Sequence, residues 1–485
     1  MITYQSRYAA QSKASGGALS LSTNERRPVR FHARIAQHLY PMRLALQTLG
    51  ELVWSDMGWI SEDEFEERME ASLDPVITVH PDRVFFEAFS QDESAYGVVI
   101  VDRDVFEDDG ATQCGTTNVD FTRGLHQALG DMRSSRDAHL HVGPAGFAVA
   151  AGDGGAHFEA KVELPDSWVR GFLQIQAAMA LPGTRFTARP ADLLRMIRFL
   201  QRNRALTSPR SVRYEFEPGR PVRAVLEPWE HEVVFGESSH NYTTAKVTRT
   251  WGRRRLSLVE KLLPWAQNVE VYLKGRGLPS FYSVQLPGVR FVLGLSGWVA
   301  GHWSQAASFD LMAPTDTDDL LTTRAVDHLR TSHRCTAQQA SDELGVTLER
   351  AHAALADACR LGMAIYDVQD REFRHRELFE TPIDPVAFYP PDPRRELART
   401  LEPSAVVGTD VRRERVVGRG KPYVDRVIDG TVASHTTHVV IKDTGQLIFG
   451  RCTCPFFDEH LMTSGPCEHM LALRRVAERA GPSAG

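Results

Sequence analysis

Three of the six cysteines in this 485-residue chain lie with a histidine in one short segment near the C-terminal end. The segment contains Cys452-Thr453-Cys454, twelve further residues, and then Cys467-Glu468-His469. A structural zinc ion takes four nitrogen or sulfur donors in a tetrahedron, which leaves no open position for catalysis. We therefore predict one structural Zn²⁺ site. Its expected ligands are Cys452, Cys454, Cys467 and His469.

The residues around these ligands predict a small ββα module. Two β-prone runs, residues 436–442 and 446–451, are separated by a short turn that contains glycine and so favour a hairpin. Pro466 stands where a first helical residue is favoured, and residues 467–480 are rich in helix formers. His460, in the segment between the two ligand pairs, is an alternative ligand.

The ligand pattern resembles the SWIM zinc finger. Further segments resemble bacterial SWIM zinc-finger proteins, namely Gly115-Thr116-Thr117-Asn118-Val119-Asp120-Phe121, Lys161-Val162-Glu163-Leu164-Pro165, Trp168 and Gly171-Phe172. The resemblance implies association with MoxR-type AAA+ ATPases and von Willebrand factor A proteins. The Gly115–Phe121 run is equally consistent with a simple entry into a helix capped by Asp120 or Thr122.

Composition places the chain among ordinary globular proteins, with 42% hydrophobic and 24% charged residues. No apolar run is long enough to span a membrane, and the first residues lack a hydrophobic signal region. Isolated cysteines such as Cys114 fit a reducing cytoplasm. We find no phosphate-binding loop, HExxH motif or triad spacing, so we expect no enzymatic activity.

Charge is unevenly distributed along the chain, whose net charge is −6. Residues 51–110 contain eighteen acids and three arginines, whereas residues 185–225 contain ten arginines and three acids. Because both segments also carry core-like apolar patterns, we expect acidic and basic faces to meet within one fold. Arg253–Arg255 beside Trp251 could instead form a stacking platform for single-stranded nucleic acid, although core aromatics are the simpler interpretation.

The expected fold is a multidomain α+β protein. Its parts are a flexible N-terminus (1–27), an α+β region (28–312, divisible into 28–235 and 236–312), a winged-helix-like module (318–380), a linker (381–410) and the finger (411–481). Residues 31–52 predict one long amphipathic helix, whereas residues 84–86 and 98–101 predict strands. A helix near 191–202 followed by a hairpin has the same order of elements as an earlier helix-plus-hairpin unit. Two such units loosely resemble a sliding-clamp repeat.

The sequence of the winged-helix-like module predicts three helices, at residues 320–330, 336–344 and 347–361, followed by a hairpin. The third helix stands in the position of a recognition helix, but its outer face offers few side chains that read bases. The hairpin is more basic, with Arg371, Arg374 and Arg376 able to meet phosphate. For this module we expect protein docking ahead of DNA binding.

Two functions follow from these features. The first is a zinc-stabilised, non-enzymatic adaptor that binds other proteins. The second is a DNA- or single-stranded nucleic-acid-binding protein that uses the finger and the winged helix. Its expected nucleic-acid contacts lie just ahead of the finger, at Arg412, Arg413, Arg415, Arg419 and Lys421.

Overall fold

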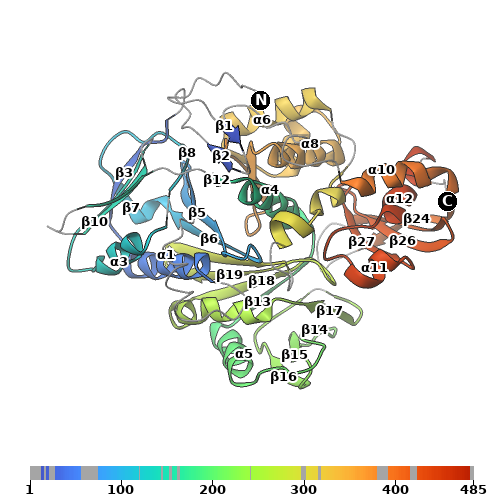
Figure 1. The fold of residues 1–485 in the computed structure, drawn as a ribbon, viewed down its shortest axis with the longest axis horizontal. Coiled ribbons are helices and arrows are strands. Elements are labelled where there is room, and N and C mark those ends of the chain that lie inside the picture. Colours follow the sequence, from blue (N-terminus) through green and yellow to red (C-terminus); the bar gives the residue numbers. More distant parts are fainter. Residues whose placement is uncertain are drawn as a thin grey trace.

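The computed structural model describes residues 13–15, 18–20, 28–55, 75–119, 121–143, 146–151, 156–160, 164–240, 242–296, 302–314, 318–378, 392–415 and 423–480. Over these ranges the chain forms helices and six sheets (Figure 1), which confirms the mixed α and β class. No helix within these ranges is long and apolar enough to cross a membrane.

An eight-stranded antiparallel sheet lies at the centre of the molecule, in the order β13-β18-β19-β20-β6-β5-β4-β8. Its strands are β4 (Val76–Val79), β5 (Arg83–Phe89), β6 (Ala95–Asp102), β8 (Gly115–Asn118), β13 (Thr184–Ala188), β18 (Asn268–Leu273), β19 (Ser280–Leu286) and β20 (Val289–Leu295). The strands predicted from the apolar runs are confirmed. The sheet also takes strands from both sides of residue 235, so the two segments 28–235 and 236–312 share it.

Two helices cover the two faces of this sheet. Helix α1 (Leu39–Val53) lies against Gly97, where an added Cβ would meet Leu52 at 2.9 Å. Helix α4 (Asp166–Ala180) covers the other face, with its Phe172 ring 4.9 Å from that of Phe89. Burial on both faces explains why β5 and β6 are almost continuously apolar.

A five-stranded sheet flanks the central one, in the order β11-β10-β9-β3-β7. Its strands are β3 (Phe31–Ile35), β7 (Phe106–Asp108), β9 (Ala138–Gly143), β10 (Gly146–Ala151) and β11 (His157–Ala160). The prediction of one helix over residues 31–52 is therefore wrong for its first part. Phe31, Ala33 and Ile35 are buried with a period of two, as in a strand, and helix α1 begins only at Leu39.

Helix α3 (Arg123–Asp131) packs against this sheet and begins as expected at Thr122, whose hydroxyl accepts a hydrogen bond from Leu125 N at 3.1 Å. The alternative cap, Asp120, lies outside the described residues. Of residues 1–27, those described form β1 (Lys13–Ser15) and β2 (Ala18–Ser20), which pair with each other, and β2 also pairs with β12 (Leu164–Pro165).

A four-stranded sheet follows, in the order β16-β15-β14-β17, beside helix α5 (Pro190–Arg202). Its strands are β14 (Val212–Phe216), β15 (Arg223–Leu226), β16 (His231–Val234) and β17 (Lys246–Thr250). Short helical turns complete this half of the chain, at η1 (Arg103–Val105), η2 (Arg253–Trp265), η3 (His302–Ala306) and η4 (Phe309–Met312).

Acids and arginines of the two charge-rich segments do form ion pairs within the fold. Their partners, however, lie in other parts of the chain than the sequence pattern predicted. Arginines of the basic segment pair with acids of their own sheet, as Arg213 does with Glu227 at 2.7 Å. Acids of residues 51–110 pair with arginines from later in the chain, as Asp92 does with Arg255 at 2.6 Å. Arg253 is also buried, and donates to Ser211 O at 2.8 Å, so this arginine run is no exposed stacking platform.

Residues 318–378 form a helical module with its own hydrophobic core. Its elements are α6 (Asp319–Ser332), β21 (Arg334–Cys335), α7 (Ala337–Leu344), α8 (Leu348–Arg360), β22 (Ala364–Asp367) and β23 (Glu372–His375). The three predicted helices and the hairpin are confirmed. Their caps are Asp318, Thr336 and Thr347, each of which accepts a hydrogen bond from the first turn of its helix.

The C-terminal part of the chain contains a four-stranded sheet, in the order β24-β25-β26-β27 (Figure 1). Its elements are α10 (Pro393–Leu401), η5 (Glu402–Ser404), β24 (Val406–Arg415), β25 (Tyr423–Val432), β26 (His435–Ile441), β27 (Leu447–Cys452), α11 (Pro455–His460) and α12 (Glu468–Ala480). The predicted hairpin is β26–β27, and the sequence pattern missed its two partner strands. Within the expected linker, the described residues form α10, η5 and the start of β24.

Candidate metal centre

Three short elements bring the four predicted ligands together. Strand β27 ends at Cys452, and Cys454 is the N-cap of α11, where its sulfur accepts from Phe457 N at 3.4 Å. Pro466 then leads to Cys467, directly before α12, and His469 lies in the first turn of that helix. The N-terminal ends of both helices favour negative charge, which suits thiolate ligands.

The four side chains form one buried cluster. Their sulfur and nitrogen ligand atoms all lie within 4.8 Å of one another. None is more than 8% exposed, and Cys467 is completely buried. The His435 ring packs edge-on against His469, with ring centroids 4.6 Å apart. His460, the alternative ligand, lies outside this cluster and packs against Phe456.

Hydrogen bonds link Cys467 to the other two thiols of this cluster. Hydrogen bonding to Cys467 lowers the pKa of Cys452 to about 5 and also lowers the pKa of Cys454. The same hydrogen bonds raise the pKa of Cys467. Because a metal ion replaces the protons of these hydrogen bonds and keeps all three sulfurs deprotonated, the arrangement is suited to cation binding.

The donor set fits zinc. Three sulfurs and one imidazole nitrogen are a common structural zinc set. Nδ1 of His469 makes no hydrogen bond among the described residues, and its nearest acidic neighbour is Glu468 Oε1 at 3.4 Å; one ring nitrogen lies within the ligand cluster. Four protein donors fill a tetrahedron, which makes the expected role structural.

Residues 438–473 match the family model of the SWIM zinc finger. The C-terminal module is a SWIM zinc finger. A search of curated proteins gave no match. Among solved structures, the proliferating cellular nuclear antigen of Entamoeba histolytica is 11% identical, with a TM-score of 0.38, and the match covers 55% of this chain and 98% of that one. The PCNA of Thermococcus kodakaraensis is 13% identical, with the same coverage and TM-score.

The SWIM finger is joined tightly to the rest of the molecule. Arg474, on α12, is 1% exposed and donates to Gly445 O and to Ala313 O, each at 3.0 Å. Arg394, on α10, donates to Ser464 O and Pro466 O at 3.0 Å, beside the ligand Cys467. The three ligand cysteines consequently belong to the same continuous core as the central sheet.

Three of the five predicted nucleic-acid residues lie on β24, at the edge of the finger sheet. Arg412 and Arg413 are exposed there. Arg415 is the last residue of the strand, and the position of its side chain is not described. Arg419 and Lys421 lie outside the described residues.

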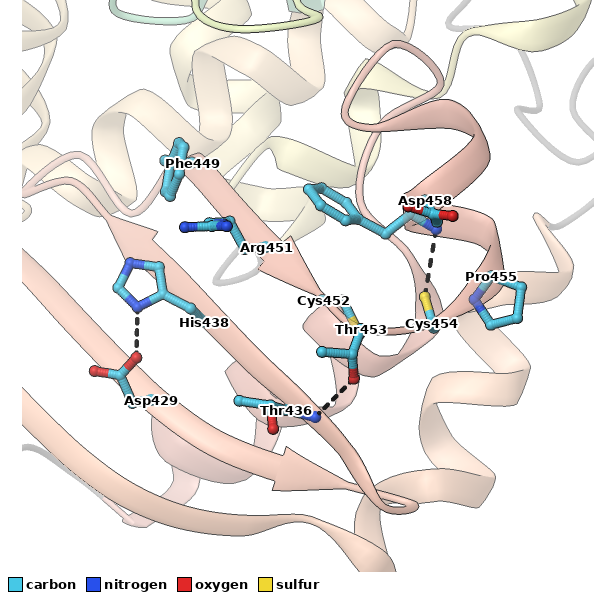
Figure 2. A pocket seen from close by; sticks show the side chains of 11 residues that line it. Asp429, Thr436, His438, Phe449, Arg451, Cys452, Thr453, Cys454, Pro455 and Asp458 are labelled. Atoms are coloured by element: carbon cyan, nitrogen blue, oxygen red, sulfur yellow. Dashed lines mark hydrogen bonds and ion pairs between the residues drawn. The ribbon is translucent and has the colours of Figure 1, made fainter. Parts of the chain in front are cut away.

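A groove of about 930 Å³ opens on the face of the finger sheet that α12 does not cover (Figure 2). It is lined by Phe449, Arg451 and His438, and by Phe457 of α11. His438 Nδ1 lies 2.6 Å from the carboxylate of Asp429. Sequence analysis missed this surface, although Phe449 and Arg451 alternate along β27 with the inward-facing Gly450 and Cys452.

Proposed function

We propose that this protein is a non-enzymatic adaptor whose zinc ion stabilises the finger and whose surfaces bind other proteins. The observation that carries the proposal is the burial of α8. This helix stands where a winged helix would present its recognition helix to DNA. In this chain it packs against α4 and against the turn of the finger hairpin instead.

Several residues of α8 face protein rather than solvent. His352 is 5% exposed and Ala353 is 1% exposed. Glu349 lies so close to the β26–β27 turn that a Cβ at Gly445 would be 2.6 Å from its Oε1. A helix covered in this way cannot enter a major groove without separating the finger from the module, which favours an internal docking role.

The arginines in and beside the hairpin of the same module also have acidic partners within the chain. Arg374 is fully buried and lies 2.9 Å from Asp82, while Arg376 lies 2.7 Å from Glu87. These two arginines are therefore not placed to neutralise phosphate, contrary to the expectation from sequence. Their pairing fixes the module to the central sheet.

The surface best suited to a partner is the groove on the finger. Phe449 is 39% exposed and lies beside the exposed Arg451, and aromatic and arginine side chains often dominate binding energy at protein interfaces. We propose that the partner is a MoxR-type AAA+ ATPase or a von Willebrand factor A protein. The resemblance to bacterial SWIM proteins supports this choice.

The test is reconstitution with the MoxR-type ATPase and the von Willebrand factor A protein of the same genome, followed by sedimentation. We expect a complex that Phe449→Ala weakens at least about tenfold, as expected for a central interface residue. Leu206→Ala is the matched control, because Leu206 is 81% exposed and lies between α5 and β14, outside the finger. Failure of both proteins to bind would refute this choice of partner.

A second candidate function is nucleic-acid binding through the exposed Arg412 and Arg413. It predicts retention of random duplex DNA with a steep dependence on salt. Each arginine that neutralises a phosphate should contribute about 0.9 to the log–log slope. Replacing Arg412, Arg413 and Arg415 by alanine should flatten that slope for all sequences alike. Absence of DNA binding at low salt would favour the adaptor.

A further inference from the structure

Three histidines gather on the outer face of the five-stranded sheet, far from the finger. His139 and His141 are two residues apart on β9 and therefore point to the same side of the sheet. His32, on β3, is the direct cross-strand partner of His141. The intervening Leu140 and the neighbouring Val142 point inward and are completely buried, which anchors β9 in the core.

The three rings lie next to one another. The ring centroids of His32 and His141 are 4.6 Å apart, and those of His139 and His141 are 6.5 Å apart. A carboxylate joins them, because Asp109 Oδ2 lies 3.0 Å from His139 Nδ1. The backbone N–H of Asp109 donates to His32 O at 2.8 Å, which holds this acid beside the histidines.

The neighbours on the sheet leave room above these rings. Along β10, the residues opposite His141 and His139 are Ala148 and Ala150, whose side chains are single methyl groups. On the other side, Arg34 lies opposite His139. Its guanidinium pairs with Glu107 and, at 3.6 Å, with Asp137, so its positive charge is compensated.

We propose that His32, His139, His141 and Asp109 form a second metal site, open to solvent, for a divalent transition-metal ion such as Zn²⁺. Three of the four donors are imidazoles, which suit zinc, copper, nickel and iron and are poor ligands for magnesium and calcium. Directly opposed residues have Cβ atoms about 5 Å apart, so side-chain rotation can close the donors on one ion while the strand register stays fixed.

Metal ligation requires neutral imidazole rings, so zinc binding at this site should weaken as the solution is acidified. Unlike the finger, this site lies at an exposed surface, where His32 and Asp109 are open to solvent, so added ions can reach it directly.

Calorimetric titration of the full chain with ZnCl₂ near pH 7.5, with zinc already in the finger, tests the proposal. We expect a second equivalent to bind, and His32→Ala or His141→Ala to weaken it at least about tenfold, since even outer partners of a ligand are worth that much. His328→Ala, on α6, is the control and should take up the one additional equivalent like the wild type.

Cobalt substitution separates this site from the finger. Co²⁺ at the histidine site should give a spectrum without the thiolate charge-transfer band that Co²⁺ in the finger shows. Circular dichroism of each variant should match the wild type, because the replaced side chains lie on the outer face of the sheet. Uptake of no additional zinc by the finger-loaded wild type, or an additional equivalent that persists in both alanine variants, would overturn the proposal.

Discussion

Arg376 Nη1 lies 2.7 Å from the carboxylate of Glu87, and neither side chain is more than 2% exposed. The same carboxylate accepts from the Tyr96 hydroxyl at 2.7 Å. These two donors compensate the negative charge of the buried carboxylate. Removing the arginine would leave that charge buried without a counter-ion, which destabilises the folded state. This pair joins the end of the helical module to the central sheet.

Replacing Arg376 by methionine should therefore lower the free energy of unfolding by about 3–5 kcal/mol, because Glu87 is left without its counter-ion. Denaturation in guanidinium chloride measures the change. Arg395→Met is the control: Arg395 pairs with Asp310 at 2.9 Å but is 48% exposed, so its loss should cost less than about 1 kcal/mol. Equal effects of the two variants would contradict the buried-pair explanation.

Zinc removal should affect more than the finger. Cys454→Ser should lower the zinc content by one equivalent per chain in metal analysis, because Cys454 is one of four donors in a closed site. Since the ligand cysteines share one core with the central sheet, we expect earlier thermal unfolding of the whole chain. Cys114→Ser, at an exposed cysteine, is the control and should retain the metal. An unchanged zinc content in Cys454→Ser would disprove the ligand assignment.

Gly445 tests the contact between the finger and α8. Its φ is +75°, and an added Cβ would lie 2.6 Å from Glu349 Oε1. Gly219 has a similar φ of +71° with open space around it, so Gly219→Ala measures the backbone cost alone, about 1 kcal/mol. Gly445→Ala should cost more than this control, and Glu349→Ala in the same chain should recover the excess. Equal costs for both glycines would mean that the contact is not tight.

His352 should make stability depend on pH. Burial and the nearby charge of Lys442 lower its pKa to about 4, from about 6.5 in the unfolded chain. Its stabilising contribution is thus fully present above pH 6.5 and is lost as pH falls toward 4. The loss is about 1.4 kcal/mol per pH unit in that window. Unfolding of the wild type and of His352→Gln at pH 7 and pH 5 measures it, and the variant should lose less stability on acidification.

The finger's metal site could be predicted from the sequence because its pattern involves residues that lie close together in the chain. The ligand spacing, the β26–β27 hairpin and the capped helices of the helical module all follow from short-range chemistry. The error at residues 31–37 arose because Ile35 and Leu39 also fit a helical spacing, whereas the buried alternation of Phe31, Ala33 and Ile35 becomes decisive only with β9 and β7 beside them.

Long-range pairing could not be predicted from the sequence. Arg374 and Arg376 have the appearance of a phosphate-binding pair, yet their partners Asp82 and Glu87 lie almost three hundred residues earlier. The histidine cluster was missed for the same reason: His32 meets His141 only when β3 and β9 pair.

The strand order of the central sheet determines how long one strand edge waits for its partner during synthesis. Strand β6 pairs along one edge with β20, where Val101 lies opposite Val289. After β6, the ribosome must therefore add about 190 further residues before β20 is available to pair with this edge. At the usual ribosomal rate of about 5–20 residues per second, that edge emerges about 10–40 s before its partner. A nascent chain of this protein therefore carries an apolar strand with one unpaired edge for much of its translation, when a chaperone or a ribosome-bound factor would protect it most.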